Sequence, residues 1–205
     1  MIKYSELNLG QIEAVVNKIG GMSGVQRLLA DELVVVEKSN LKPVVTEARD
    51  FAIWKTVTLG LKKSPKDYRK AMEKDGYRVG DYAGQILNKT EVSQTEVELD
   101  LVVVTVGELG FKDGARRDVF YARAIELGLQ LCPAEVGPSL RLLYKDQPRG
   151  EWLRIGMEPI TPSDGDPGVF EVDYDDGARW LYGFYGYADG VWIADYQWVF
   201  VRPRK

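Results

Sequence analysis

The sequence predicts a mixed α+β fold: a helical hairpin and a mixed segment at the N-terminal side, then a β-rich unit with one prominent helix. Three patterns support this prediction. Apolar residues recur at helical spacing over residues 12–33, and they occupy both faces of an expected strand at residues 97–106. Aromatic residues alternate with other residues in segments near the C-terminus. A chain of 205 residues can bury a core in one large domain or in two small ones.

Two short helices are expected first. Asn8 and Gln11 form a plausible capping pair for a helix that ends at Gly20 and Gly21. Ser23 with Gln26 would cap the second helix in the same way. The two apolar stripes then predict a hairpin resembling a helix–turn–helix, in which each helix buries its apolar face.

The next segment mixes strands and helices. Residues 34–36 are expected to form a short strand and residues 38–43 a linker, and residues 51–59 alternate as a strand does. Ser64 followed by Pro65 is typical of a helix start, because proline suits the first helical turn.

Further along, Gly76 would end that helix and Asp81 would cap a shorter one. The polar residues 89–95 then predict a domain boundary, with a helical and mixed part over residues 1–92 and a β-rich α+β domain over residues 93–205. Charge follows a similar division. Residues 1–94 hold 15 basic and 12 acidic residues, whereas residues 95–205 hold 12 and 19.

The second part should begin with a central strand over residues 97–106, followed by a helix over residues 115–127 that Gly128 ends. Residues 129–132 read as a short strand and residues 133–138 as a rigid connector. A hairpin is expected around the turn KDQPRG, and aromatic strands follow it; the segments are 140–144 and 151–158 for the hairpin, then 169–174, 179–185 and 191–201.

The composition excludes several kinds of chemistry. There is no histidine, so Ser-His-Asp and Cys-His catalysis and His-ligated zinc are excluded. Cys132 is the single cysteine, and its apolar surroundings favour a structural role. Glycine-rich phosphate loops are absent, residues 163–166 resemble only a fragment of a calcium loop, and no metal or cofactor is expected. Without a signal peptide or an apolar span, the expected location is cytoplasmic.

The expected hairpin provides the candidate binding site. If Lys145 pairs with Gly150, Arg141 lies opposite Arg154, and like charges across a sheet are unfavourable unless an anion separates them. The alternatives are that each arginine pairs with an acidic residue, or that a shift of one residue separates them. The candidate ligand-binding residues are Arg141, Arg154, Trp152, Glu158 and Tyr144.

A basic stretch on the first part is the best nucleic-acid footprint, although acidic residues dilute it and a solvated helix face is the simpler interpretation. Its residues are Lys55, Lys62, Lys63, Lys66, Arg69, Lys70, Lys74 and Arg78.

Three stretches carry a resemblance. They are QIEAVVNKIGGMSGVQRLLADELVV at 11–35, FAIWKTVTLG at 51–60 and ELGLQLCPAEVGPSLRLLYKDQPRGEWLRIGMEPI at 126–160. The chain resembles, nearly end to end, a family of uncharacterised proteins abundant in small-genome candidate-phylum bacteria. The resemblance implies a bacterial cytosolic origin. That family has no established activity, so the resemblance implies no catalytic residues.

Three functions are therefore open. The leading hypothesis is a non-catalytic, cytosolic binding or regulatory protein that holds an anionic small molecule or a protein partner. It would use the face of Arg141, Trp152 and Arg154, or a patch of the C-terminal aromatic residues. One alternative is a hydrolase or transferase that uses carboxylates and arginines, from a pool of Glu135, Arg141, Tyr144, Arg154 and Glu158. Another is a DNA-binding regulator that uses the 11–33 hairpin, although its second helix offers little to a phosphate backbone. The residues leave open whether the chain is an enzyme and what its oligomeric state is.

Overall fold

The computed structural model describes residues 8–19, 21–30, 49–162 and 165–204. The chain divides into two compact units, Met1–Val44 and Val45–Lys205, and each is considered by itself. The sequence-predicted boundary at residues 92 and 93 falls inside the second unit. The strand expected at 34–36 and the linker expected at 38–43 lie outside the described residues.

The first unit contains α1 (Leu9–Lys18) and α2 (Gly21–Leu29). The predicted capping pair is confirmed, because the Asn8 side chain accepts from the Gln11 backbone at 2.9 Å and the Gln11 side chain accepts from the Asn8 backbone at 3.0 Å. The second cap is wrong. Since α2 begins at Gly21, Ser23 lies inside the helix.

The two helices bury little of their apolar faces within the described part of the chain. Ile12, Val15 and Leu29 are exposed, Leu29 at 80%. Val16, Ile19, Val25 and Leu28 are half-buried, so each apolar stripe is buried only in part within the described residues.

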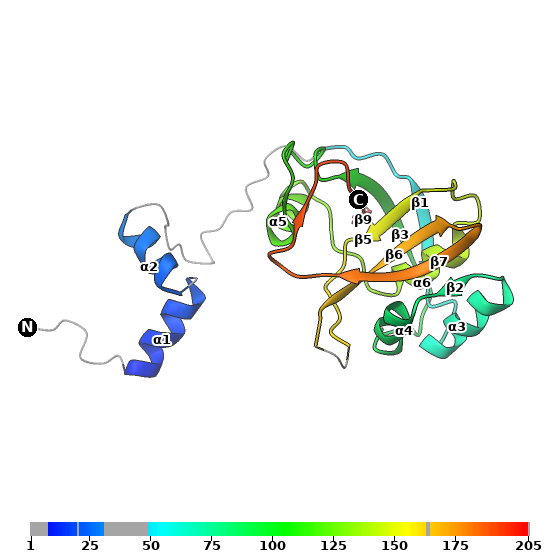
Figure 1. Cartoon of the computed structure of the whole chain (residues 1–205), viewed down its shortest axis with the longest axis horizontal. Coiled ribbons are helices and arrows are strands. Elements are labelled where there is room, and N and C mark those ends of the chain that lie inside the picture. Colours follow the sequence, from blue (N-terminus) through cyan, green and yellow to red (C-terminus); the bar gives the residue numbers. More distant parts are fainter. Residues whose placement is uncertain (1–7, 20, 31–48, 163–164, 205) are drawn as a thin grey trace, which may run out of the picture. The chain divides into compact units, whose positions relative to one another are not determined.

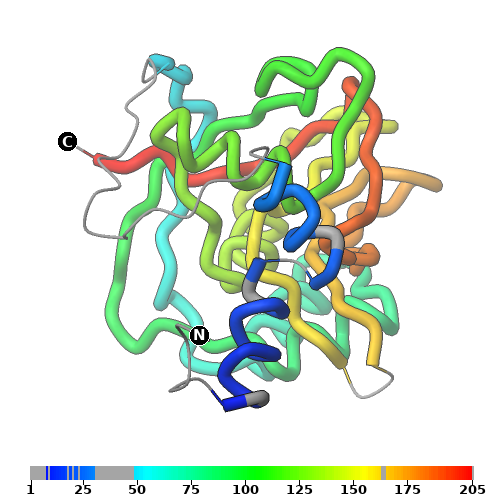
Figure 2. Tube along the Cα trace, turned by 90° about the vertical axis from the view of Figure 1, so that its left-hand side faces the viewer, coloured from blue at the N-terminus to red at the C-terminus, as the bar shows by residue number. Residues whose placement is uncertain are grey.

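The second unit is a seven-stranded mixed sheet in the order β1-β3-β9-β5-β6-β7-β2, with a separate pair β4-β8 and four helices (Figure 1). Its C-terminal strand, red in Figure 2, inserts between β3 and β5, so distant segments build the centre of the sheet. The elements in chain order are β1 (Lys55–Leu59), α3 (Pro65–Lys74), β2 (Arg78–Val79), α4 (Asp81–Asn88), β3 (Val97–Thr105), β4 (Ala115–Arg116), α5 (Arg117–Glu126), α6 (Val136–Leu143), β5 (Trp152–Ile155), β6 (Gly168–Asp175), β7 (Ala178–Tyr185), β8 (Val191–Trp192) and β9 (Gln197–Arg202).

Helices cover both faces of this sheet. On one face, α6 packs against Phe170 so closely that a Cβ at Gly137 would lie 2.6 Å from its ring, and α4 packs against Gly183, which pairs with Phe170. On the other face, Phe120 and Tyr121 of α5 meet the Trp198 ring at 5.0 and 5.6 Å. The helices therefore lie on both sides of the sheet (Figure 1), and buried residues fill the space between each helical layer and the sheet.

The prediction of a strand at 140–144 is wrong, because these residues belong to α6 and its C-cap. Leu-Arg-Leu alternates as a strand does, but Val136 and Leu140 also stand one helical turn apart, and both are fully buried. Pro138 falls in the first turn, where the missing N–H has no helical partner to lose. The predicted hairpin is therefore a helix followed by β5.

The other long elements confirm their predictions with small shifts. Ser64 caps α3 and Pro65 is its first residue, and β3 spans 97–105. Asp81 opens α4, but Gly80 occupies the cap. The strand expected at 51–59 begins at Lys55, and the last expected strand is divided into β8 and β9.

None of the helices that the structure describes is long and apolar enough to cross a membrane.

Candidate binding groove

Arg141 lies on α6 and is completely buried. Its Nη1 donates to the Gln147 side chain and to the Asp173 carbonyl, and its Nη2 donates to the Tyr144 carbonyl. Burial lowers the pKa of Arg141 to about 10, so the guanidinium keeps its charge at neutral pH. Its partners are protein groups, which fix the end of α6 against β6.

Arg154 lies on β5, on the opposite face of the sheet, and is 4% exposed. Its Nη2 pairs with Glu171 Oε2 at 3.0 Å. Four aromatic rings surround the guanidinium with centroids 4.4–4.7 Å away, which is cation–π distance. They are Trp152, Phe184, Trp192 and Tyr196. Sequence reasoning placed Trp152 beside Arg154 but missed Glu171.

The other two predicted residues lie elsewhere. Tyr144 is the C-cap of α6, and its ring meets the Trp54 ring edge-on at 5.0 Å with Lys55 Nζ 4.4 Å from its centroid. Glu158 is exposed and lines a depression of about 460 Å³ with Lys89 and residues 131–134. The five predicted residues are therefore spread over both faces of the sheet, and Arg141 does not lie opposite Arg154.

Glu135 connects three segments at one end of the sheet. The carboxylate is 1% exposed. Oε1 accepts from the Gly60 backbone N–H at 2.9 Å and from the Tyr68 hydroxyl at 2.7 Å, and Oε2 accepts from the Ser93 backbone N–H at 2.8 Å. Because Glu135 is also the N-cap residue of α6, it ties this helix to α3 and to the loops that follow β1 and precede β3.

Tyr68 carries this network into a cavity. Since the single Tyr68 proton is donated to Glu135, the Ser139 hydroxyl, 2.6 Å away, donates its own proton to the Tyr68 oxygen. Burial raises the pKa of Tyr68 well above its ordinary value, so this phenol stays protonated. Tyr68 and Ser139 form the polar floor of the cavity, and neither is placed to remove a proton from a ligand.

The cavity has a volume of about 380 Å³ and lies between β1, α3 and α6. Its walls are mostly apolar, with hydroxyls on the floor and charged residues at the mouth. A depression of about 390 Å³ adjoins it along α3 and shares Leu61, Lys62, Ala71 and Lys74. We call the two together the β1 groove. The lining residues of the cavity are Thr56, Val57, Thr58, Leu61, Lys62, Tyr68, Ala71, Lys74, Asp75, Ser139, Leu142 and Leu143.

Lysines dominate the mouth of the β1 groove. Lys62, Lys70 and Lys74 line it, and within the described residues their ammonium groups make no ion pair or hydrogen bond. Lys63 lines it as well, but donates to the Gly60 and Gln94 carbonyls at 2.7 and 2.9 Å. Asp67 and Asp75 are the acidic residues of the lining. The mouth therefore has a positive excess.

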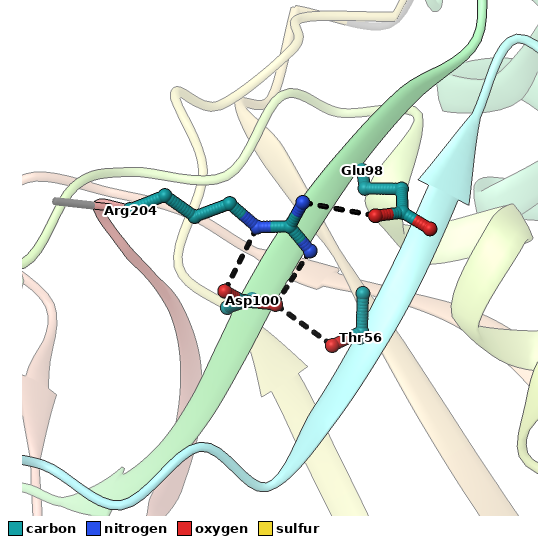
Figure 3. Close-up of polar contacts among 4 residues, drawn as sticks. All are labelled: Thr56, Glu98, Asp100 and Arg204. Carbon is teal, nitrogen blue, oxygen red and sulfur yellow. Dashed lines mark hydrogen bonds and ion pairs between the residues drawn. The ribbon is translucent and has the colours of Figure 1, made fainter.

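A polar cluster fixes the wall that β1 forms. Thr56 Oγ1 donates to Asp100 at 2.7 Å, and the Arg204 guanidinium binds both oxygens of Asp100 at 2.9 Å and Glu98 at 2.9 Å (Figure 3). These hydrogen bonds lower the pKa of Asp100. The cluster joins β1, β3 and the segment after β9, so it holds the edge strand of the groove in place.

No protein-family model, curated protein or solved structure matches this chain.

Some residues of the β1 groove and its network were candidates from the sequence, but they were not predicted to lie together. Glu135 was in the pool for the alternative enzyme, and the lysines of α3 were in the basic stretch. Tyr68 is 1% exposed and belongs to the buried core. No motif indicated that Tyr68 meets Glu135 and Ser139, since Tyr68 lies 67 residues from Glu135 and 71 residues from Ser139 along the chain.

Proposed function

We propose that this chain is a non-catalytic binding protein that holds an anionic ligand with an apolar body in the β1 groove. One observation carries the proposal. A largely apolar cavity of about 380 Å³ has lysines at its mouth that no described residue pairs. Apolar walls bind the body of a ligand by burial, and a few charged groups at the rim orient it.

The buried network supports binding rather than catalysis. Glu135 is 1% exposed and accepts hydrogen bonds from three donors, which occupy its carboxylate. Tyr68 keeps its proton, and Ser139 donates to Tyr68 without a base beside it. This arrangement makes a rigid floor for a ligand, and a catalytic nucleophile would need a neighbouring base.

Octanoate is a suitable first probe because it combines an apolar chain with one carboxylate. We expect isothermal titration calorimetry to detect octanoate binding that weakens as salt screens the lysines. Replacing Lys62 and Lys74 with alanine should weaken it by about fivefold per lysine, which corresponds to ~1 kcal/mol for an exposed charge pair.

Lys66→Ala provides the matched control. Lys66 lies on the same helix and is exposed, but it does not line the β1 groove. It should leave the octanoate affinity unchanged. Equal binding of octanoate and of a cationic amphiphile of the same chain length would contradict the proposed role of the lysines.

A further inference from the structure

The β1 groove runs along the free edge of a strand. β1 is at one end of the seven-stranded sheet and pairs with β3, and among the described residues no strand pairs with its other edge. Side chains of consecutive strand residues point to opposite faces. Thr56, Val57 and Thr58 nevertheless all line the same cavity, which fits a cavity along the free edge of the strand better than one over a single face.

The groove is longer than a single compact pocket. The cavity beside β1 continues into the adjoining depression along α3, with Leu61, Lys62, Ala71 and Lys74 common to both. Leu142 and Leu143 of α6 form an apolar wall on the side of β1, and Leu143 is 45% exposed. An elongated site with one backbone edge and one apolar wall suits an extended chain.

The charge of the groove limits which extended chain fits. Lys62, Lys70 and Lys74 are unpaired among the described residues, while Asp67 already accepts from the Ser64 hydroxyl at 2.7 Å. A strand that enters the groove presents side chains alternately to its two sides. Alternating acidic and apolar residues would place carboxylates near the lysines and apolar groups against Leu142 and Leu143.

We propose that the ligand of the β1 groove is an extended segment of a protein partner, with alternating acidic and apolar residues, that pairs its backbone with the free edge of β1. This inference rests on the proposed function and names the class of its ligand. The partner's backbone N–H and C=O groups satisfy those of the edge strand, and its carboxylates meet the lysines of α3. The Thr56–Asp100–Arg204 cluster keeps β1 in place while the added strand pairs.

The test uses the 205-residue chain and four probes, which are three fluorescently labelled peptides and octanoate as a competitor. The first is a short peptide that alternates glutamate and valine. The second has the same sequence with alternate backbone nitrogens methylated, which removes the donors needed for strand pairing. The third replaces glutamate with lysine, and the fourth is octanoate. Fluorescence anisotropy measures the affinity of each peptide, and hydrogen exchange of the β1 amides reports pairing directly.

We expect the glutamate–valine peptide to bind, to slow exchange in β1, and to lose about tenfold or more in affinity on methylation. Lys70→Glu with Lys74→Glu should weaken it by a similar factor, whereas Lys66→Glu should not. Equal affinity of the methylated peptide, or no change in β1 exchange, would overturn strand pairing. If octanoate binds and no peptide does, this inference fails and the proposed function stands; if neither binds, both fail.

Discussion

At the scale of single residues, the Arg154–Glu171 pair places two charges inside the sheet, where burial is costly. Both residues are less than 9% exposed, and burial raises the pKa of Glu171 while Arg154 opposes that shift. Four aromatic rings replace part of the water around the guanidinium. The energy of such a pair depends on both partners being present.

We therefore expect Glu171→Gln to lower the free energy of unfolding by about 3 kcal/mol, since it leaves Arg154 buried without its countercharge. The double variant Arg154→Met with Glu171→Leu should recover most of this loss. Glu126→Gln, which breaks the exposed pair with Arg123, should cost no more than about 0.5 kcal/mol. Urea unfolding measures all three. Equal stability of Glu171→Gln and the parent protein would show that the pair is not coupled.

Gly60 is the second residue at which a substitution should strongly lower the stability. Its φ is +77°, and a Cβ there would lie 2.1 Å from the Thr95 carbonyl oxygen. Gly76 has nearly the same φ, +75°, but nothing lies within 4 Å of its Cβ position. Alanine at Gly76 should cost about 1 kcal/mol for the left-handed backbone alone, and alanine at Gly60 about 3 kcal/mol or more. Similar losses in urea unfolding would mean that the loop moves away freely.

At the scale of elements, the cluster around Asp100 makes the edge of the sheet sensitive to acid (Figure 3). Hydrogen bonds from Arg204 and Thr56 lower the pKa of Asp100 below 3.8. A carboxyl with a depressed folded pKa contributes stability that is complete above its ordinary pKa and is lost as the pH falls through the folded value. Asp100→Asn should thus be less stable than the parent at neutral pH, and the difference should shrink below pH 3.8.

Urea unfolding at a series of pH values tests this prediction. Asp118→Asn is a suitable control, because it removes an exposed ion pair with Arg116 and should change the free energy of unfolding little. If the difference between the Asp100→Asn variant and the parent stays constant into acid, another group controls the edge.

Elements with local signals could be predicted from the sequence. The capping pair of α1, the Ser-Pro start of α3 and the two-sided apolar pattern of β3 each depend on neighbouring residues, and all three are observed. α6 could not be predicted, because Leu140-Arg141-Leu142 fits either period and packing against Phe170 decides between them. For the same reason the β1 groove was missed: Glu135 meets Gly60 and Tyr68 only after the helix has formed.

At the scale of the whole molecule, the sheet separates two kinds of interior. One face carries the helices α3, α4 and α6 and the Glu135 network, and the other carries α5 and the aromatic surroundings of Arg154. The β1 groove opens where the first of these layers reaches the end of the sheet, so β1, α3 and α6 supply most of its lining and the loop between β1 and α3 supplies Leu61 and Lys62. A rigid edge lowers the ordering cost of adding a strand.

The buried apolar core that the structure describes lies within Val45–Lys205, from Val57 to Val201. All five tryptophans also belong to this unit, so tryptophan fluorescence reports on it alone. We expect a chain that begins at Val45 to unfold in urea cooperatively, with the midpoint and slope of the full-length protein, because its core is complete without α1 and α2. Circular dichroism should show a smaller helical signal, because α1 and α2 are removed. A clearly lower midpoint would mean that residues 1–44 stabilise the sheet unit, and a lower slope would mean that its core is incomplete.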